Sequence, residues 1–272
     1  IMENIKFEAV LVESAKLPMV KIDRELFLRK ELRDRYSQET VEKAIQYNPA
    51  YAGICVEDIN KIAKSCITAE TTKVTALSAA AGLPGGFIMI GTVPADLYQY
   101  FGHILRILQK LIYLYGWHDL SLDSKEMNEE TKNLLTLFVG IMFGVNGAVN
   151  TVNKLAAQVA KQVVKKLPQK ALTKGVIYPI VKKVATILGV QMTKQIFARG
   201  VAKGVPVLGA AVSGGLTFVT FKPMSEKLRK YLASSELASV EYYKKMDDET
   251  VIDIEVLDDI KCCLLYTSLS GL

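Results

Sequence analysis

Few of the side chains that build metal centres and most catalytic sites occur in this chain of 272 residues. Its cysteines and histidines are Cys55, Cys66, Cys262, Cys263, His103 and His118. No two cysteines have the C-x-x-C spacing of a zinc or redox site, and no P-loop, G-x-S-x-G or H-E-x-x-H motif is present. We therefore expect no metal, no cofactor and reduced thiols. The N-terminal residues show no charged segment followed by an apolar one, so no secretory signal is expected.

Acidic residues are missing from a long central stretch. No Asp or Glu occurs between Glu130 and Glu226, although residues 131–225 hold 13 of the 34 basic residues. Segregated charge of this kind predicts an anionic partner. All but one of these cations, Arg199, are lysines, whereas bidentate contacts to phosphates and bases favour arginine. Because no zinc finger, helix-turn-helix glycine turn or aromatic RNA-binding signature accompanies them, nucleic acid is disfavoured as the partner.

Charge of either sign is missing from three long runs, which are residues 74–95, 133–153 and 204–221. The first has 22 residues, which is long enough to cross a bilayer. Glycine and proline interrupt it, and the backbone groups that they free would be costly in lipid. The interrupting residues are Gly82, Pro84, Gly85, Gly86 and Pro94. We therefore expect a packed hairpin whose glycines let the flanking helices approach closely. In the second run, the spacing of Gly140, Gly144 and Gly147 also suits close helix packing.

Helical periodicity dominates the rest of the chain. The expected helices cover residues 22–36, 37–49, 56–81, 95–115 and 151–174. Ser37 is a capping-type residue, and Pro94 and Gly116 suit the start and the end of the 95–115 helix. That helix carries one apolar stripe, so we expect it to be mostly buried. The stripe consists of Leu97, Phe101, Ile104, Leu108, Leu111 and Tyr115.

These patterns predict an all-α protein. We expect a single multi-helix bundle with Gly-rich packed hairpins, about eight to ten helices and little or no sheet. The domain covers residues 1–245, with its core at about 15–235, and an acidic tail covers residues 246–272. Alternation at 251–256 could form one short strand. The last 11 residues resemble translated vector sequence, and no inference rests on them.

One long motif resembles a known family. The stretch "GLPGGFIMIGTVPADLYQYFGHILRILQKLIYLYGW" at 82–117 is similar to the signature of the EcsC family of bacterial proteins. The stretches "LPMVKIDRELFLRKEL" at 17–32 and "GVPVLGAAVSGGLTFVTFKPMSEKL" at 204–228 fit the same family. The family takes its name from an operon with an ABC transporter, so the resemblance implies an association with membrane transport or protein export. It brings no agreed catalytic residues.

The leading functional hypothesis is a non-enzymatic protein at the cytoplasmic face of the cell membrane, peripheral or partly embedded. The 151–174 helix is basic and amphipathic, as membrane-surface helices are, and each lysine near an anionic surface contributes about 1 kcal/mol. The expected lipid-binding residues are Lys154, Lys161, Lys165, Lys166, Lys170 and Lys174. The basic half could instead dock on the acidic N-terminal part of the same chain. ABC-transporter components and a second copy of the chain stay open as partners.

An enzyme is the alternative hypothesis. Asp96, Gln99, His103 and Arg106 lie at i, i+3, i+7 and i+10 on one face of the 95–115 helix. Asp and His in this arrangement could bind a metal or share a proton, in a small-molecule, lipid-binding or metal-dependent site. The same four residues could also be the solvated polar face opposite the apolar stripe, and we expect no catalytic residue among them.

Overall fold

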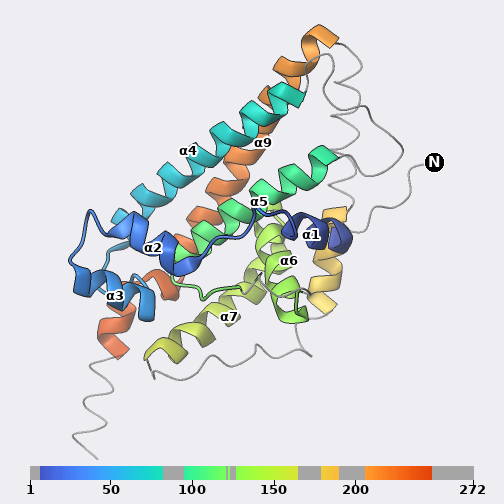
Figure 1. Ribbon diagram of the computed structural model, residues 1–272. Helices are drawn as coiled ribbons and strands as arrows, with labels where there is room; N and C mark the ends of the chain where they lie inside the picture. The colour runs from blue at the N-terminus through green and yellow to red at the C-terminus, as the bar shows by residue number, and fades with distance from the viewer. Residues whose placement is uncertain are drawn as a thin grey trace, which may run out of the picture.

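The computed structural model describes residues 7–81, 95–120, 122, 127–164, 179–189 and 206–246 (Figure 1). Within these ranges the regular structure is helical and no strand occurs, which confirms the predicted all-α class. The helices are α1 (Phe7–Ala15), α2 (Arg24–Leu32), α3 (Gln38–Gln46), α4 (Val56–Ala81), α5 (Ala95–Leu114), α6 (Glu129–Phe143), α7 (Asn146–Val164), α9 (Pro206–Ala233) and the short 3₁₀ helix η1 (Glu236–Ala238). Residues 179–189 and 240–246 are also helical. The predicted hairpin at 82–94 and the predicted strand at 251–256 lie outside the described residues.

Local signals in the sequence explain several helix ends. The Ser37 side chain accepts a hydrogen bond from the backbone N–H of Thr40, which caps α3 as predicted. After α5, Gly116 has a φ of +95°, a left-handed conformation that glycine adopts without strain. A Cβ at Gly116 would lie 3.0 Å from the carbonyl oxygen of Leu237, so the turn also needs the missing side chain. The predicted C-terminal stop of the 95–115 helix is confirmed.

Three helices form the centre of the bundle. The long helices α4 and α9 pack along each other, and α5 lies against both (Figure 1). Every residue of the predicted apolar stripe of α5 is buried, because α1, α4, α6 and α9 all contact this helix. Tyr100 of α5 meets α9 through Thr220, with 3.2 Å between the two hydroxyl oxygens. Lower down, Asn60 of α4 accepts hydrogen bonds from Tyr115, just after α5, and from Arg229 of α9.

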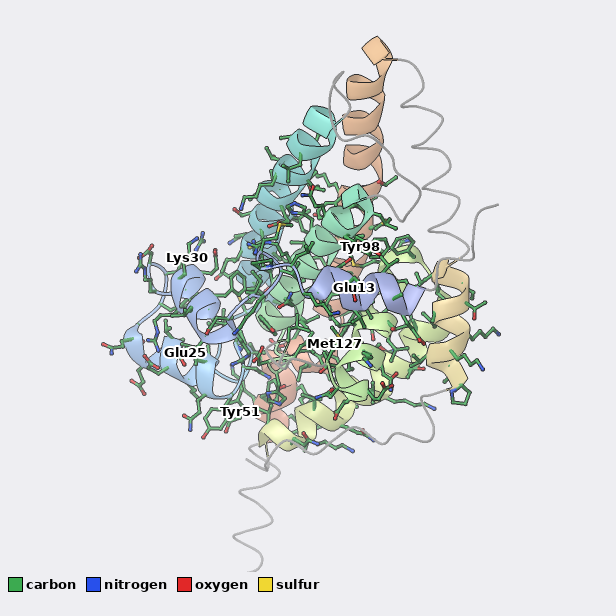
Figure 2. All side chains as sticks on the ribbon, turned by 45° about the vertical axis from the view of Figure 1, so that its right-hand side comes forward. Glu13, Glu25, Lys30, Tyr51, Tyr98 and Met127 are labelled. Atoms are coloured by element: carbon green, nitrogen blue, oxygen red, sulfur yellow. The ribbon has the colours of Figure 1, made fainter. Side chains whose placement is uncertain are left out.

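The remaining helices cover the two sides of this centre. Helices α2 and α3 pack on each other, and α2 contacts α5. The charged side chains of Glu25 and Lys30 lie on the outer side of α2, away from the bundle (Figure 2). On the other side, α1 and α6 contact α5, and α7 packs against α6.

Close helix packing at Gly140 is confirmed. A Cβ there would lie 2.6 Å from Cγ1 of Val184 and 3.0 Å from Cβ of Ala148, so two neighbouring helices meet α6 at this point. Gly144 has a φ of +79° and ends α6 in a left-handed cap. Gly147 is different, because the nearest side-chain atom to its Cβ position would be Cγ2 of Ile180 at 3.9 Å. A Cβ at Gly144 would lie 2.9 Å from Nζ of Lys227 on α9, which is the end of a flexible side chain. Of the three predicted packing glycines, Gly140 is therefore the one whose closest contacts are the less movable atoms of two neighbouring helices.

Candidate functional site

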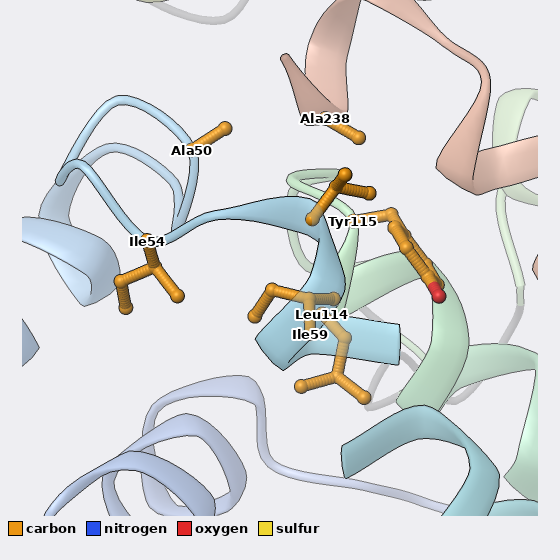
Figure 3. A pocket seen from close by; sticks show the side chains of 7 residues that line it. Ala50, Ile54, Ile59, Leu114, Tyr115 and Ala238 are labelled. Atoms are coloured by element: carbon orange, nitrogen blue, oxygen red, sulfur yellow. The ribbon is translucent and has the colours of Figure 1, made fainter. Parts of the chain in front are cut away.

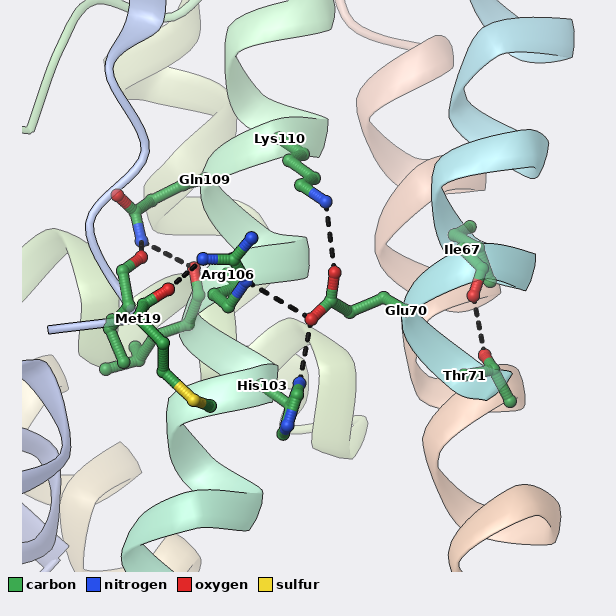
Figure 4. A network of polar contacts seen from close by, with 10 residues as sticks. Met19, Ile67, Glu70, Thr71, His103, Arg106, Gln109 and Lys110 are labelled. Atoms are coloured by element: carbon green, nitrogen blue, oxygen red, sulfur yellow. Dashed lines mark hydrogen bonds and ion pairs between the residues drawn. The ribbon is translucent and has the colours of Figure 1, made fainter. Parts of the chain in front are cut away.

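A buried carboxylate lies between α4 and α5 (Figure 4). Glu70 of α4 is 0% exposed, and its two oxygens meet three side chains of α5. Oε1 lies 2.7 Å from Nδ1 of His103 and 3.3 Å from Nε of Arg106. Oε2 accepts a hydrogen bond of 3.0 Å from Nζ of Lys110. Since residues three and four apart share a helix face, one face of α5 supplies all three partners.

The neighbours of Glu70 determine its ionisation. Burial alone would raise its pKa, but the hydrogen bond with His103 and the charges of Lys110 and Arg106 outweigh burial and lower the pKa to about 2. At neutral pH the group is therefore a carboxylate, which can only accept hydrogen bonds. Nδ1 of His103 is therefore the donor in its hydrogen bond with Glu70.

The same face of α5 also holds the segment that precedes α2. The Arg106 guanidinium donates to the carbonyl of Met19. Gln109 donates from Nε2 to the carbonyl of Val20 at 2.9 Å and accepts from the backbone N–H of Ile22 at 3.1 Å. Arg106 thus links Glu70 to the 17–22 segment, and the cluster joins three parts of the chain.

The polar face that the sequence predicts for α5 is only partly exposed to solvent. His103 is 4% exposed and Arg106 is half-buried, so these two residues face α4 instead of solvent. Gln99 is exposed, and the side chain of Asp96 lies outside the described residues. The reading of all four as a solvated polar face is therefore wrong for His103. Glu70 was missed, although a sequence signal exists: it falls three residues after Ile67, on the apolar face of the predicted 56–81 helix.

The cluster has the pieces of a general base, but its histidine and its carboxylate are both buried. A carboxylate that holds the Nδ1–H of an imidazole leaves Nε2 free to take a proton, and here Nε2 is buried with no hydrogen-bond partner in the described part of the chain. Among the described residues, no three His, Cys, Asp or Glu side chains gather as a metal site would require. We interpret the cluster as a polar contact that fixes the position of α4 on α5.

A small apolar crevice lies at the other end of α5 (Figure 3). It has no room for a water molecule. Its lining residues are Ala50, Ile54, Val56, Ile59, Leu114, Tyr115 and Ala238. Because it offers neither space nor convergent polar groups, we interpret this crevice as a packing gap.

The lysine-rich part of the chain is partly described. On α7, Lys154 and Lys161 are exposed, and their seven-residue spacing places them on one face. Gly147 lies on the same face, and the contact of its Cβ position with Ile180 brings the 179–189 helix beside it. Lys182 and Lys183 follow within one turn and are exposed as well. These four lysines, which we call the lysine surface, make no ion pair within the described residues. The predicted Lys165, Lys166, Lys170 and Lys174 lie outside them.

The apolar face of α7 packs inside the protein. Its residues Val152, Leu155, Ala156, Val159 and Val163 are all buried, as the predicted amphipathic pattern requires. The partners of α7 include α6 and η1. In this structure the face that could have entered lipid is therefore already used by the bundle.

A second titratable group lies where α5 meets α2 and α3. The Arg24 guanidinium donates to the carbonyls of Ile45 and Tyr47 at the end of α3 and to that of Trp117 after α5. Next to it, burial and then the Arg24 charge lower the pKa of His118 to about 4. His118 is therefore neutral at physiological pH.

His118 is expected to make folding sensitive to mild acid. Because its pKa is lowered in the fold, the unfolded chain takes up the proton first as the pH falls below 6.5, so stability is complete above 6.5 and declines toward pH 4. We expect the wild type to lose about 1 kcal/mol more than a His118→Gln variant between pH 7 and pH 5, since His118 is half-buried. Urea unfolding at both pH values measures this, and equal losses in the two proteins would contradict it.

No family model, no curated protein and no solved structure matches this chain. In the part of the chain that the structure describes, no helix has the length and apolar character needed to cross a bilayer.

Proposed function

We propose that this protein is a peripheral membrane protein that binds anionic lipid headgroups through its lysine surface. One observation supports this most directly: Lys154, Lys161, Lys182 and Lys183 are exposed on neighbouring helices and have no acidic partner among the described residues. No acidic residue occurs in the sequence between Glu130 and Glu226 that could neutralise them locally. An unbalanced patch of this kind attracts an anionic surface.

The packing of α7 favours one mode of binding. Since the apolar face of α7 is buried in the bundle, this helix contacts lipid through its lysines and does not sink into the acyl chains. Binding by charge alone is reversible and weakens as salt screens the interaction. We place the protein at the cytoplasmic face of the cell membrane, where anionic lipids give the surface a negative potential.

The resemblance to the EcsC family supports a link between this binding and transport. The resemblance rests on the motif at residues 82–117, and it suggests a protein that accompanies an ABC transporter or an export system. The proposal does not assign a catalytic step, because His103 is closed off within the Glu70 cluster.

Vesicle flotation tests the lysine surface. We expect the wild type to float with vesicles of phosphatidylcholine and phosphatidylserine, and to float poorly with phosphatidylcholine alone. Changing Lys154, Lys161, Lys182 and Lys183 to Gln is expected to weaken binding to the anionic vesicles at least about tenfold, because each lysine near the surface contributes about 1 kcal/mol.

A matched control variant shows whether vesicle binding depends on where the lysines lie or only on the net charge of the protein. Lys16, in the turn after α1, and Lys30, Lys64 and Lys244, on other helices, are exposed, and changing these four to Gln removes the same charge. We expect this control to bind almost as the wild type does. A control that loses as much binding, or a wild type that floats equally well with neutral vesicles, would show that the lysine surface is not the membrane contact.

A further inference from the structure

We propose that a second part of this protein enters the apolar region of a lipid bilayer: the end of the α4–α9 pair, residues 74–81 and 206–219, which we call the arm. The proposal rests on the proposed membrane function and adds a separate contact to it. Helices α4 and α9 both run on past the start of α5 at one end of the molecule (Figures 1 and 2).

The contact between Tyr100 and Thr220 shows how far the arm extends. From this contact, α5 continues for five residues to Ala95, whereas α9 continues for 14 residues to Pro206. At about 1.5 Å per residue, α9 reaches roughly 14 Å beyond the start of α5. The arm is thus a pair of helices that projects from the bundle.

The arm contains no charged residue. On α4 the last charged residue is Lys73, and on α9 the first is Lys222. The third charge-free run, residues 133–153, needs no such explanation, because most of α6 is buried in the core. The described helical parts of the other two runs, residues 74–81 of α4 and 206–221 of α9, lie at the same end of the molecule (Figure 1).

One exposed leucine lies on the arm. Among the described residues, only Leu26 and Leu77 are large apolar side chains with substantial exposure, at 66% and 47%. Leu26 stands among the charged residues of α2, whereas Leu77 follows Lys73 in the charge-free part of α4. Single exposed leucines are ordinary, so the position of Leu77 matters more than its exposure.

Lipid fits the arm better than a protein partner does. Two helices of about 10 Å diameter, of which α9 projects roughly 14 Å and α4 less, offer a face of at most about 300 Å². A stable protein interface needs about 800 Å² from each partner, so a second copy of the chain would be held weakly by this face. A bilayer requires no matching surface, and a charge-free helix pair can enter its headgroup–acyl boundary by about 5–10 Å.

The arm and the lysine surface are separate contacts. Helix α7 lies toward the end of the molecule opposite to the arm in both views (Figures 1 and 2). A loss of binding at one contact can therefore be measured apart from a loss at the other.

Tryptophan scanning with brominated lipid tests the arm. The full chain has one tryptophan, Trp117, which is buried and gives a constant background. We expect emission from a Leu77→Trp variant to move to shorter wavelength and to be quenched on anionic vesicles with brominated acyl chains. The Leu26→Trp variant is the matched control, and its emission should not change.

The possible results distinguish the arm from the lysine surface. If the wild type binds vesicles but Leu77→Trp is not quenched, the arm does not enter lipid and the lysine surface still can. If Leu77→Trp is quenched and the lysine variant binds normally, the arm is supported and the lysine surface is overturned. A blue shift of Leu77→Trp that grows with protein concentration in the absence of lipid would mean that a second copy covers the arm, which overturns lipid entry. No binding by the wild type overturns both proposals.

Discussion

A Glu70→Gln variant is expected to lose about 3–5 kcal/mol of unfolding free energy at neutral pH, because it leaves buried cations without their counter-charge. Lys110 and Arg106 both pair with this carboxylate, at 3.0 and 3.3 Å, and both are largely removed from solvent. The amide of Gln keeps the shape of the side chain but can neutralise neither cation. Urea unfolding at pH 7 measures the loss.

The same carboxylate predicts how stability depends on pH. Glu70 has a pKa of about 2 in the fold and an ordinary value of 4.5 when unfolded. Its contribution is therefore complete above pH 4.5 and is lost as the pH falls toward 2, a total of about 3 kcal/mol. The Glu70→Gln variant should lack this part of the acid sensitivity.

Glu57 provides the control on the same helix. It is exposed in the first turn of α4 and forms no ion pair with a cation among the described residues, so Glu57→Gln should change stability by less than about 1 kcal/mol. If the two variants lose equal stability, the Glu70 cluster does not hold α4 on α5.

Replacing Gly140 with Val is expected to cost about 2–3 kcal/mol, the upper part of the usual range for overpacking. Its Cβ alone would lie 2.6 Å from Val184, and the methyl groups of Val would come closer still or displace the neighbouring helices. Thermal or urea unfolding measures this loss.

Gly147 is the natural comparison for Gly140. It is exposed near the start of α7, with no side-chain atom closer than 3.9 Å to its Cβ position. Gly147→Ala should therefore leave stability unchanged or raise it by up to about 1 kcal/mol through better helix propensity. A loss at Gly147 as large as at Gly140 would contradict the assignment of the tight contact to Gly140.

The sequence predicts well those elements whose faces and ends are determined by residues close to one another in the sequence. Helix α5 is an example, because its apolar stripe repeats every three or four positions and Gly116 marks its end. The cap at Ser37 is another, since its partner Thr40 is only three residues away. Gly140 was also predicted, because a small residue in an apolar helix signals a close neighbour even when that neighbour is unknown.

The Glu70 cluster could not be predicted in the same way. Glu70 and His103 are 33 residues apart, and no local pattern states which face of α4 meets which face of α5. The sequence shows polar residues on α5 but does not show whether solvent or a buried carboxylate faces them. For α7 the amphipathic pattern was predicted correctly, but the pattern does not show what covers the apolar face. A face of Val152, Leu155 and Val159 can pack against another helix as well as against lipid.

One hydrogen bond in the bundle has a consequence for synthesis of the chain. Asn48, which is fully buried, donates from Nδ2 to the hydroxyl of Tyr243 at 2.7 Å, across 195 positions of sequence. The pairing of α4 with α9 is also distant in sequence, because Arg229 donates to Asn60 across 169 positions. On the ribosome, the first helices therefore emerge long before the partners that bury their apolar faces. Until α9 and Tyr243 have been synthesised, the apolar face of α4 is exposed and can cause aggregation. Rapid synthesis of the C-terminal part of the chain, or binding of a chaperone to α4, should therefore raise the yield of folded protein.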